Sequence, residues 1–478
     1  MSWDGFVGRE RELAMLRDEL GAVGRPRGPR GKALMMRGRR RVGKSRLVTE
    51  FIQRCSIPAM YFQAYRNMPA RDQLAALVQA IAESSLPGAA YVSPEATPSS
   101  LTGAFRMVAG ALPRDTPSIV VLDEVPWLLE AIRGGAGQLQ QMWDHELERL
   151  PVLLILMGSD VAMMRELTAY DQPFHGRARE IVISALTPGD IAAWTGTRGI
   201  DAFDAYLLTG GQPLVASEWG TGMTPQEFVE TSLARPASAL VSEGIRVLDG
   251  EFPPESSART VLTAMGGRGE RSFAKIQRSV GESMAVGSLR NALDLLTMKQ
   301  VVTWEDPYSA RLALRDRRWR IADPALRFWL ALVEPSLGDI DRGRHDLAVR
   351  RFNDGYAQWR GRAIEPVVRE ALALLLPNAT WPEAHYVGGW WPRNNIPEID
   401  LVAGDAQPAH RLSLVGTIKW RSTPLRMDEY DSLAESAPII PGFRGDTSLV
   451  GVCPGGAGDA PFSQVWNADD LLAAYGQR

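Results

Sequence analysis

The segment GRRRVGKS, residues 38–45, constrains the fold more than any other part of this sequence. A short apolar run, residues 33–36, precedes it, and an amphipathic stretch, residues 46–55, follows it. This order predicts a strand, a glycine-rich loop and a helix, with the spacing Gly-x-x-x-x-Gly-Lys-Ser/Thr of a phosphate-binding loop. The segment therefore predicts an α/β fold built on a parallel sheet.

The chemistry of this loop predicts that it binds ATP with Mg²⁺. Backbone N–H groups of such a loop surround phosphates at the N-terminus of the following helix, where the helix dipole favours anions. We expect Lys44 to reach the β- and γ-phosphate oxygens and Ser45 to hold Mg²⁺. A chance match in a loop rich in glycine and basic residues is the alternative. The predicted nucleotide contacts in this segment and directly after it are Gly38, Gly43, Lys44, Ser45 and Arg46.

A second motif, SIVVLDEVPWLL at residues 118–129, lies at the distance expected for such a nucleotide site. Its apolar residues 119–122 run without alternation, which is typical of a central parallel strand buried on both faces. Asp123 follows at the carboxyl edge of the sheet, where ligands gather, and we expect it to hold the water shell of Mg²⁺. Glu124 is expected to orient the attacking water. Alone, this acidic pair would also suit a surface turn, but with the loop it predicts an ATPase.

Two further residues are candidates for sensing or stabilising the γ-phosphate. Ser159 ends a third apolar run, VLLILMGS, and its hydroxyl is placed to sense the γ-phosphate. Arg177, in QPFHGRARE, is a candidate arginine finger that reaches the nucleotide of a neighbouring subunit. That role implies a homo-oligomer. The alternative is an ordinary turn arginine in solvent.

The segments FVGRERELAML, GRRRVGKS, VVLDE, LMGSDVAMM, PFHGR and LLTGGQPLV together resemble the archaeal-type ATPase family, on the AAA+/STAND side of the P-loop proteins. The resemblance covers roughly the first 220 residues of the chain. It implies that Pro213, in GGQP, opens a helix of a small lid that faces the nucleotide. Gly-Gly and Pro also favour a plain helix cap or turn. The resemblance further implies contact with the adenine by Phe6, Val7, Gly8 and Arg9.

The middle of the chain predicts a winged helix-turn-helix. Three helical segments after residue 256 are followed by two strand-like runs around a turn, and the third helix, near residues 283–299, would enter the major groove of DNA. Because this helix has few basic residues beyond Arg290 and Lys299, docking of a protein is the alternative. The arginines expected to line the wing and meet phosphates are Arg311, Arg315, Arg317, Arg318 and Arg320.

The last part of the chain follows the PD-(D/E)xK nuclease plan. A helical stretch at residues 359–376 precedes three strand-like runs, and the resemblance implies a metal site at the positions of Glu365, Asp400 and Lys419. Such a site needs two or three carboxylates to hold Mg²⁺ near the scissile phosphate and a lysine to position the water.

One position departs from this plan. Thr417 stands where the resemblance expects an acid, and a neutral hydroxyl does not replace a negative charge at a site for a hard cation. Glu398 is the best candidate for a migrated acid, because it lies two residues before Asp400, and Glu383 is the next. The favoured interpretation is a nuclease-like fold kept for binding or regulation, with weak or absent cleavage.

Composition limits the class of protein. With 478 residues, a net charge of −3 and two cysteines far apart, the chain fits a multidomain cytoplasmic protein, and any contact with nucleic acid must come from local basic patches. We expect no membrane partner, because no apolar run approaches the roughly 18 residues that a spanning helix needs. The five histidines are scattered without the spacing of zinc ligands.

The predicted architecture is a P-loop NTPase sheet with a helical lid, followed by a winged helix-turn-helix and an α/β restriction-endonuclease-like domain. The predicted function is an ATP-driven switch that engages DNA. Two alternatives remain: an active, ATP-regulated and Mg²⁺-dependent DNA endonuclease that serves in defence, and an ATP-dependent scaffold for protein interactions. The predicted boundaries are 1–187 for the ATPase core, 188–250 for the lid, 251–335 for the winged helix and 336–478 for the nuclease-like domain.

Overall fold

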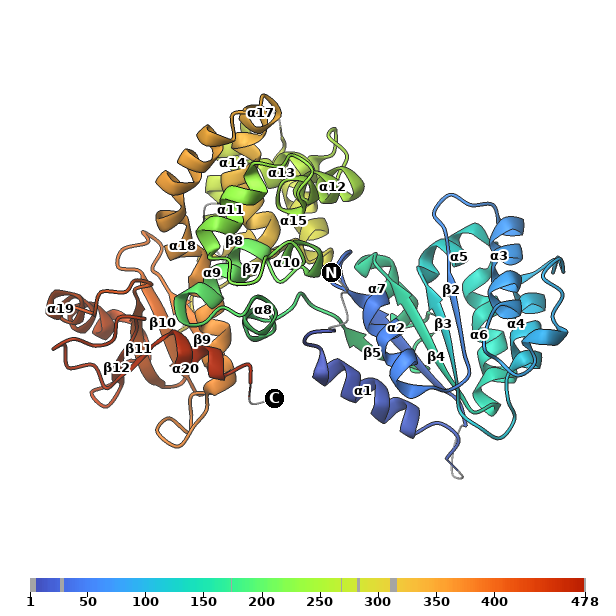
Figure 1. The fold of residues 1–478 in the computed structure, drawn as a ribbon. Coiled ribbons are helices and arrows are strands. Elements are labelled where there is room, and N and C mark those ends of the chain that lie inside the picture. Colours follow the sequence, from blue (N-terminus) through green and yellow to red (C-terminus); the bar gives the residue numbers. More distant parts are fainter. Residues whose placement is uncertain are drawn as a thin grey trace. The chain divides into compact units, whose positions relative to one another are not determined.

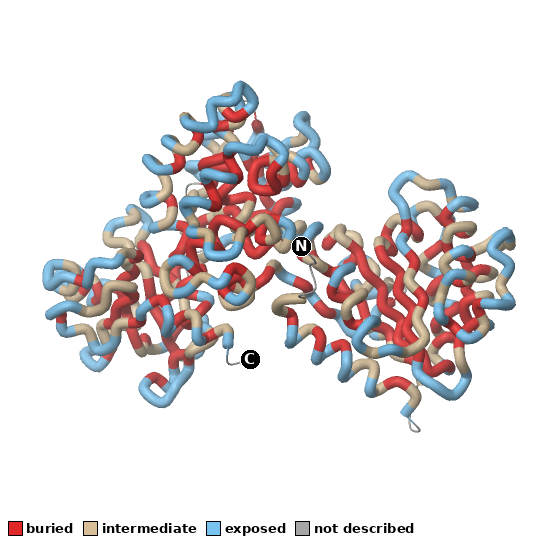
Figure 2. The backbone as a smooth tube through the Cα atoms, viewed as in Figure 1, coloured by how far each residue is buried: buried red, intermediate tan, exposed pale blue. Residues whose placement is uncertain are grey.

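The computed structural model forms two compact units, Met1–Ala185 and Leu186–Arg478 (Figure 1). It describes residues 6–25, 30–172, 174–267, 269–281, 284–309 and 316–476. Each unit has its own buried apolar residues. In the first unit the residues of the strands are mostly buried (Figure 2).

The first unit is built on a five-stranded sheet with the order β2-β3-β4-β1-β5, and every pair of neighbouring strands is parallel. Strands β3 and β4 are buried at every position, which confirms the prediction from their uninterrupted apolar runs. The strands are β1 (Lys32–Arg37), β2 (Ala59–Gln63), β3 (Ser118–Asp123), β4 (Val152–Gly158) and β5 (Ala178–Val182).

Helices cover both faces of this sheet (Figure 1). Successive residues of β1 point to opposite faces, so Met35 packs in the core beneath α3, α4 and α6, while Leu34 and Met36 pack in the core beneath α1 and α2. The helices are α1 (Glu10–Gly21), α2 (Lys44–Cys55), α3 (Ala70–Ala82), α4 (Leu101–Ala111), α5 (Val125–Ala131), α6 (Gly135–His145) and α7 (Val161–Thr168), with 3₁₀ turns at Ala89–Tyr91 and Leu147–Arg149.

The second unit begins with a helical region in the span predicted as a lid. Capping boxes at Thr187 and Thr224 fix the starts of two of its helices, each with proline in the first turn. The helices are α8 (Pro188–Thr195), α9 (Gly199–Thr209), α10 (Pro213–Ala216), α11 (Pro225–Leu233) and α12 (Ala239–Glu251).

Three helices and a small antiparallel sheet follow, in the span predicted as a winged helix. The sheet has the strand order β6-β8-β7. Residues 310–315, between β7 and β8, lie outside the described part of the chain, and with them the predicted wing residues Arg311 and Arg315. The elements are α13 (Ser257–Met265), β6 (Arg271–Ser272), α14 (Phe273–Val280), α15 (Val286–Met298), β7 (Val302–Glu305) and β8 (Arg318–Ile321).

A 31-residue helix, α18 (His345–Leu375), leads into the C-terminal sheet. The prediction placed the start of this helix at residue 359, which is wrong, because the preceding turns bury only a few residues, such as Ala348 and Phe352, and give a weak apolar stripe. The segment before it contains α16 (Pro324–Phe328), a π-helical turn (Trp329–Val333), a 3₁₀ turn (Glu334–Ser336) and α17 (Leu337–Asp341).

The C-terminal sheet is mixed, with the order β13-β12-β11-β10-β9. Strands β9, β10 and β11 pair antiparallel, whereas β11, β12 and β13 pair parallel. The elements are β9 (Tyr386–Trp390), β10 (Ile399–Gly404), β11 (Leu412–Ile418), α19 (Met427–Ser436), a 3₁₀ turn (Ala437–Ile439), β12 (Ser448–Val452), β13 (Gln464–Trp466) and α20 (Ala468–Ala473).

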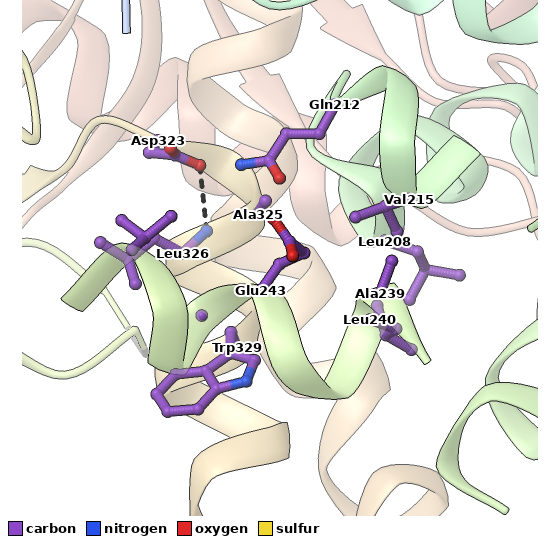
Figure 3. A pocket seen from close by; sticks show the side chains of 12 residues that line it. Leu208, Gln212, Val215, Ala239, Leu240, Glu243, Asp323, Ala325, Leu326 and Trp329 are labelled. Atoms are coloured by element: carbon purple, nitrogen blue, oxygen red, sulfur yellow. Dashed lines mark hydrogen bonds between the residues drawn. The ribbon is translucent and has the colours of Figure 1, made fainter. Parts of the chain in front are cut away.

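One hydrophobic core joins the parts of the second unit. Its buried residues extend from Leu186 to Ala474, so the helical region, the small sheet and the C-terminal sheet pack together, and the boundaries at 250 and 335 stay predictions. A cavity of about 20 Å³ lies where α9, α12 and α16 meet, with Leu208, Leu240 and Leu326 in its wall (Figure 3). Because ligand pockets usually measure about 300 to 1,000 Å³, this cavity belongs to the packing of the helices and is no substrate site.

Candidate nucleotide site and a second polar pocket

The glycine-rich loop requires its glycines for two different reasons. A Cβ on Gly38 would lie 2.2 Å from the carbonyl oxygen of Ile183, so no side chain fits there. Gly43 has φ 92°, in the left-handed region that glycine adopts without a steric penalty, and α2 begins at the next residue. The loop thus turns sharply between β1 and α2 and directs the N-terminus of α2 at the space where phosphates are expected.

Lys44 lies folded over this loop. Its Nζ donates to the carbonyl oxygens of Gly38 at 2.7 Å and Arg39 at 3.0 Å, and only 6% of the residue is exposed. The ammonium group is therefore held inside the turn, and its contact with phosphate oxygens stays a prediction.

Ser45 and Asp123 meet although 78 positions separate them in the sequence. The Ser45 hydroxyl donates to Asp123 Oδ2 at 2.7 Å. A hydroxyl and a carboxylate are hard oxygen ligands of the kind that Mg²⁺ prefers, and a Mg²⁺ ion in such sites is also bound by substrate phosphates. These two side chains therefore fit the predicted Mg²⁺. Among the described residues no group of three or more His, Cys, Asp and Glu side chains is arranged to hold a metal.

Glu124 and Ser159 also lie at this edge of the sheet. Glu124 has φ 54° and directly precedes α5, and its Oε2 accepts a hydrogen bond from the backbone N–H of Ser159 at 3.2 Å. The Ser159 hydroxyl accepts from Nε of Arg40, a loop residue, at 3.4 Å. The structure thus brings Asp123, Glu124 and Ser159 together at the carboxyl ends of β3 and β4, while their catalytic roles stay predictions.

Tyr61 is a site residue that the sequence analysis missed. It lies on β2, and its hydroxyl donates to Asp123 Oδ2 at 2.6 Å, so that this carboxylate oxygen accepts from both Tyr61 and Ser45. Burial and the negative charge of Asp123 raise the pKa of Tyr61, which keeps the phenol protonated as a donor. The only signal in the sequence was a tyrosine near the carboxyl end of an apolar run, AMYFQ.

Arg9 supports the loop, although the resemblance implied contact with the adenine. Its Nη2 donates to the carbonyl oxygen of Val42 in the loop at 2.8 Å and also to that of Ser184, and only 7% of the residue is exposed. The Phe6 ring packs against the guanidinium of Arg54, 5.6 Å from the ring centre. The adenine contacts of Phe6, Val7, Gly8 and Arg9 stay predictions.

The remaining predicted nucleotide residues have partners of their own. Arg177 makes a two-point ion pair with Asp144 of α6, with Nε at 2.8 Å and Nη2 at 3.0 Å. A role as an arginine finger stays a prediction, and this ion pair would have to open for it. Arg46 is exposed in the first turn of α2 and lies 3.7 Å from Glu50. Pro213 begins α10 in the second unit, and its role at the nucleotide stays a prediction.

The predicted nuclease-like residues line a second, larger pocket. Its volume is about 780 Å³, within the usual range for ligand sites. The pocket lies between α18 and the carboxyl end of β11, and it is lined by Leu332, Arg351, Asp354, Gly355, Ala357, Gln358, Trp359, Gly361, Arg362, Glu365, Asp400, Ile418 and Lys419.

Asp400 of this pocket is surrounded by hydrogen-bond donors. Its Oδ2 accepts from the Thr417 hydroxyl at 3.1 Å and from the backbone N–H of Ile418 at 2.9 Å, and Lys419 Nζ lies 3.5 Å away. Thr417 therefore contributes a donor where the nuclease plan needs a second metal-binding carboxylate. This arrangement stabilises one anionic carboxylate without a cation from solution.

Arginine side chains supply positive charge to the other carboxylates. Arg362 Nη1 lies 3.3 Å from Glu365 Oε1 and 3.2 Å from Glu398 Oε1, and Arg318 Nη1 lies 2.7 Å from the same oxygen of Glu398. Burial opposes ionisation of Glu398, but Arg318 and Arg362 outweigh it and lower its pKa. The hypothesis that Glu398 replaces the missing metal ligand is thus not supported, because two guanidinium groups occupy this carboxylate. Glu383 lies 3.9 Å from Arg411 and does not line the pocket.

The pKa of Glu365 shifts in the opposite direction, although Arg362 lies near this carboxylate as well. Only 7% of this residue is exposed, and burial together with the nearby charge of Asp400 raises the pKa of Glu365 to about 8. Arg369, itself 6% exposed, donates to Glu305 at 3.0 Å and to the Asp400 carbonyl oxygen at 3.0 Å, and so links this pocket to the small sheet.

The expectation that the wing arginines meet phosphates is wrong for Arg318, which is buried, whereas for the partly exposed Arg317 it stays a prediction. The Arg318 guanidinium lies 4.1 Å from the centre of the Trp391 ring, and its side chain is only 9% exposed. Arg317 forms a two-point ion pair with Asp306, both bonds at 2.9 Å, and lies 3.4 Å from the centre of the Trp304 ring. The charges that looked available in the sequence are paired with carboxylates of the same chain, because Arg317 and β8 lie next to acidic side chains. Arg320 likewise lies 3.7 Å from Glu305.

Comparison with known proteins supports the nucleotide site. A family described as "AAA ATPase domain" matches residues 5–155, and a family described as "Archaea bacterial proteins of unknown function" matches residues 329–432. An uncharacterized protein of Methanocaldococcus jannaschii is 22% identical over 429 residues, which cover 87% of this chain and 88% of that protein.

The chain also has a weak similarity to solved structures. A Walker-type ATPase of Pyrococcus abyssi has a TM-score of 0.48 and 19% identity, and the match covers 68% of this chain and 96% of that one. The ORC2 protein of Aeropyrum pernix, in ADPNP–ADP complexes, has a TM-score of 0.45 and 12% identity, with 73% and 96% covered.

The first unit therefore carries a P-loop ATPase domain, and the protein is an ATPase. The match to the AAA ATPase domain spans the loop, Asp123 and Glu124, all at one edge of a parallel sheet. In the described parts of the chain, none of the helices combines the length and apolar character that crossing a membrane requires.

Replacing Glu365 by glutamine should remove a pH dependence of stability. The carboxyl group has a pKa of about 8 in the folded protein against an ordinary value of 4.5. Its stabilising contribution is therefore complete below about pH 4.5 and lost as the pH rises through about 8, by up to about 1.4 kcal/mol per pH unit. Glu365→Gln cannot ionise, so its free energy of unfolding should exceed that of the wild type increasingly over this range.

The measurement is denaturant unfolding between about pH 4.5 and 8.5, where Glu365→Gln is compared with Glu383→Gln. Glu383 is exposed and does not line the pocket, so its replacement should leave the wild-type pH dependence in place. Parallel curves for all three proteins would contradict the raised pKa of Glu365.

Proposed function

We propose that the protein is an ATP-driven switch, in which Mg²⁺–ATP binding and hydrolysis in the first unit control what the second unit binds. The observation that carries the proposal is the contact between Ser45 and Asp123, at 2.7 Å, beside the folded Lys44. It joins a hydroxyl and a carboxylate at the N-terminus of α2, where phosphates and their Mg²⁺ are bound in P-loop proteins. Packing of the sheet against its helices does not require this polar contact.

Each residue of the proposed site has a role that its chemistry supports. Ser45 and Asp123 would hold Mg²⁺, which neutralises charge on the β- and γ-phosphates when bound. Lys44 balances the remaining phosphate charge, and Glu124, next to the end of β4, orients water for attack on the γ-phosphorus. Tyr61 holds Asp123 in place through its hydrogen bond at 2.6 Å.

For the second unit, we infer that the three helices and the small sheet form a winged helix that engages DNA. The order of helices and strands supports this assignment, with α15 in the position of the recognition helix. The surface of α15 favours a second candidate, a protein partner, because it exposes the apolar side chains Val286, Leu295 and Met298 beside a single arginine, Arg290. Salt dependence of binding separates the two, since only DNA binding releases many counterions.

We also infer that the pocket at Asp400 retains a nuclease-like fold but does not cleave DNA efficiently. The Thr417 hydroxyl donates to Asp400, and Arg362 lies between Glu365 and Glu398, so donors and guanidinium groups take up the carboxylates that a metal would need. This arrangement argues against the alternative of an active, ATP-regulated endonuclease.

Two variants of the nucleotide site should separate binding from hydrolysis. Lys44→Ala should lose ATP binding and turnover, because the phosphate charge is no longer matched. Glu124→Gln should bind ATP but hydrolyse it at least about 100-fold more slowly, since the amide keeps the shape and loses the carboxylate. Binding is measured with a fluorescent ATP analogue and turnover by phosphate release. Wild-type turnover by Lys44→Ala would contradict the nucleotide site itself, whereas normal turnover by Glu124→Gln alone would reassign only the group that orients water.

If α15 contacts DNA, Arg290→Ala should weaken binding about equally for all sequences and reduce the salt slope by about 1. The measurement is fluorescence anisotropy of labelled duplexes at several salt concentrations, with and without ATP. Arg350→Ala removes an equal charge from the exposed face of α18 and serves as the matched control. Unchanged affinity and slope in Arg290→Ala would favour the protein partner.

Restoring the missing acid should raise nuclease activity. We expect little Mg²⁺-dependent cleavage of plasmid DNA by the wild type and more by Thr417→Glu, which places a carboxylate beside Asp400. Thr417→Gln has the same size without the charge and should stay inactive, and Asp400→Ala should remove the gain of Thr417→Glu. Strong wild-type cleavage that is lost in Glu398→Ala would show instead that the acid has migrated.

A further inference from the structure

The phosphate-binding loop of this chain contains three consecutive arginines, residues 39–41. Arg40, the middle one, is exposed, and its side chain reaches from the loop to the end of β4, where its Nε lies 3.4 Å from Ser159 Oγ. The contact joins the loop after β1 to the residue after β4, and these two strands are neighbours in the sheet. It places a permanent positive charge beside the residue predicted to sense the γ-phosphate.

A continuous row of polar groups connects Arg40 with the catalytic edge. Ser159 accepts from Arg40 through its hydroxyl and donates to Glu124 through its backbone N–H at 3.2 Å. The backbone N–H of Glu124 in turn donates to Asp123 Oδ1 at 2.9 Å. The guanidinium is therefore linked to the proposed Mg²⁺ ligand Asp123 through three successive contacts, whereas Lys44 is held inside the loop.

Hydrolysis of ATP needs positive charge at this location. A bond forms between the water oxygen and the γ-phosphorus, and the bond from that phosphorus to the β–γ bridging oxygen breaks. The electron pair of the broken bond leaves on ADP, and the proton of the water passes to the product phosphate. In such reactions an arginine that stabilises the charge on the terminal phosphate and the leaving oxygen raises the rate strongly.

We propose that Arg40 is a catalytic residue that supplies this arginine from within the same chain. The assignment rests on the proposed ATPase site and deepens it. The Arg40 side chain is exposed and lies next to Ser159. Rotation about its χ angles would bring the guanidinium N–H donors to a terminal phosphate bound at the loop. Arg177, the candidate for a finger from a neighbouring subunit, is engaged by Asp144 in its own chain. Turnover should therefore not depend on the concentration of the protein.

The test compares Arg40→Ala, Arg40→Lys and Arg165→Ala in the full-length chain. Arg40→Ala should lower kcat by about 100-fold or more with little change in KM or in binding of a fluorescent ATP analogue. Arg40→Lys keeps the charge without the planar fork and should recover part of the rate. Arg165 is exposed on α7 and is not part of the loop, so Arg165→Ala should keep the wild-type rate. Melting curves of all variants monitor folding.

The outcomes distinguish the new assignment from the proposed function. Equal kcat for Arg40→Ala and Arg165→Ala would overturn the role of Arg40 and leave the ATPase site in place. A rate that rises with protein concentration and is lost in Arg177→Ala would show that the cation comes from a neighbouring subunit, which also overturns it. If the wild type hydrolysed no ATP, the ATPase site and the role of Arg40 would both be wrong.

Discussion

The nucleotide site of this protein depends on Asp123 Oδ2, an oxygen that accepts hydrogen bonds from Ser45 and Tyr61 at 2.7 and 2.6 Å. The three residues come from α2, β2 and β3, so the parallel sheet must be formed before they meet. In a parallel sheet the carboxyl ends of all strands lie at one edge, and the polar residues that follow the strands converge there. The buried strands thus serve to hold a few polar atoms at fixed positions, and this rigidity is what ATP hydrolysis requires.

The carboxylates of the second unit have a different environment. Around Glu365 and Asp400 the positive charges come from arginine and lysine side chains of the chain itself. One of these, the buried Arg369, also pairs with Glu305 of the small sheet. Buried charges are costly unless they are paired, and removal of one partner costs more than the pair contributes. Paired charges of this cluster therefore link the pocket to the small sheet.

Several arginines of this chain lie in similar basic stretches of sequence, yet the stretch alone does not show whether an arginine is paired with an acid or stays exposed. Arg317 and Arg318 were expected on the surface of a wing, yet both stack on tryptophans and pair with acids, and Arg318 is buried. Arg40, in an equally basic stretch, stays exposed beside Ser159. The difference comes from the neighbours that folding supplies: carboxylates and aromatic rings at β8, and the open phosphate edge at the loop.

The sequence by itself determined the features that contiguous residues encode. The loop, the buried strand that ends in Asp123 and the acid at position 124 follow from spacing and apolar pattern, because a P-loop is local in sequence and its strand is buried on both faces. Only the tertiary structure decided which partners the polar groups meet, such as Tyr61 at Asp123 and the donor Thr417 at Asp400. It also decided that α18 begins well before residue 359. The physical reason is that hydrogen bonds and ion pairs depend on distances between distant segments, and no periodicity in the sequence encodes those distances.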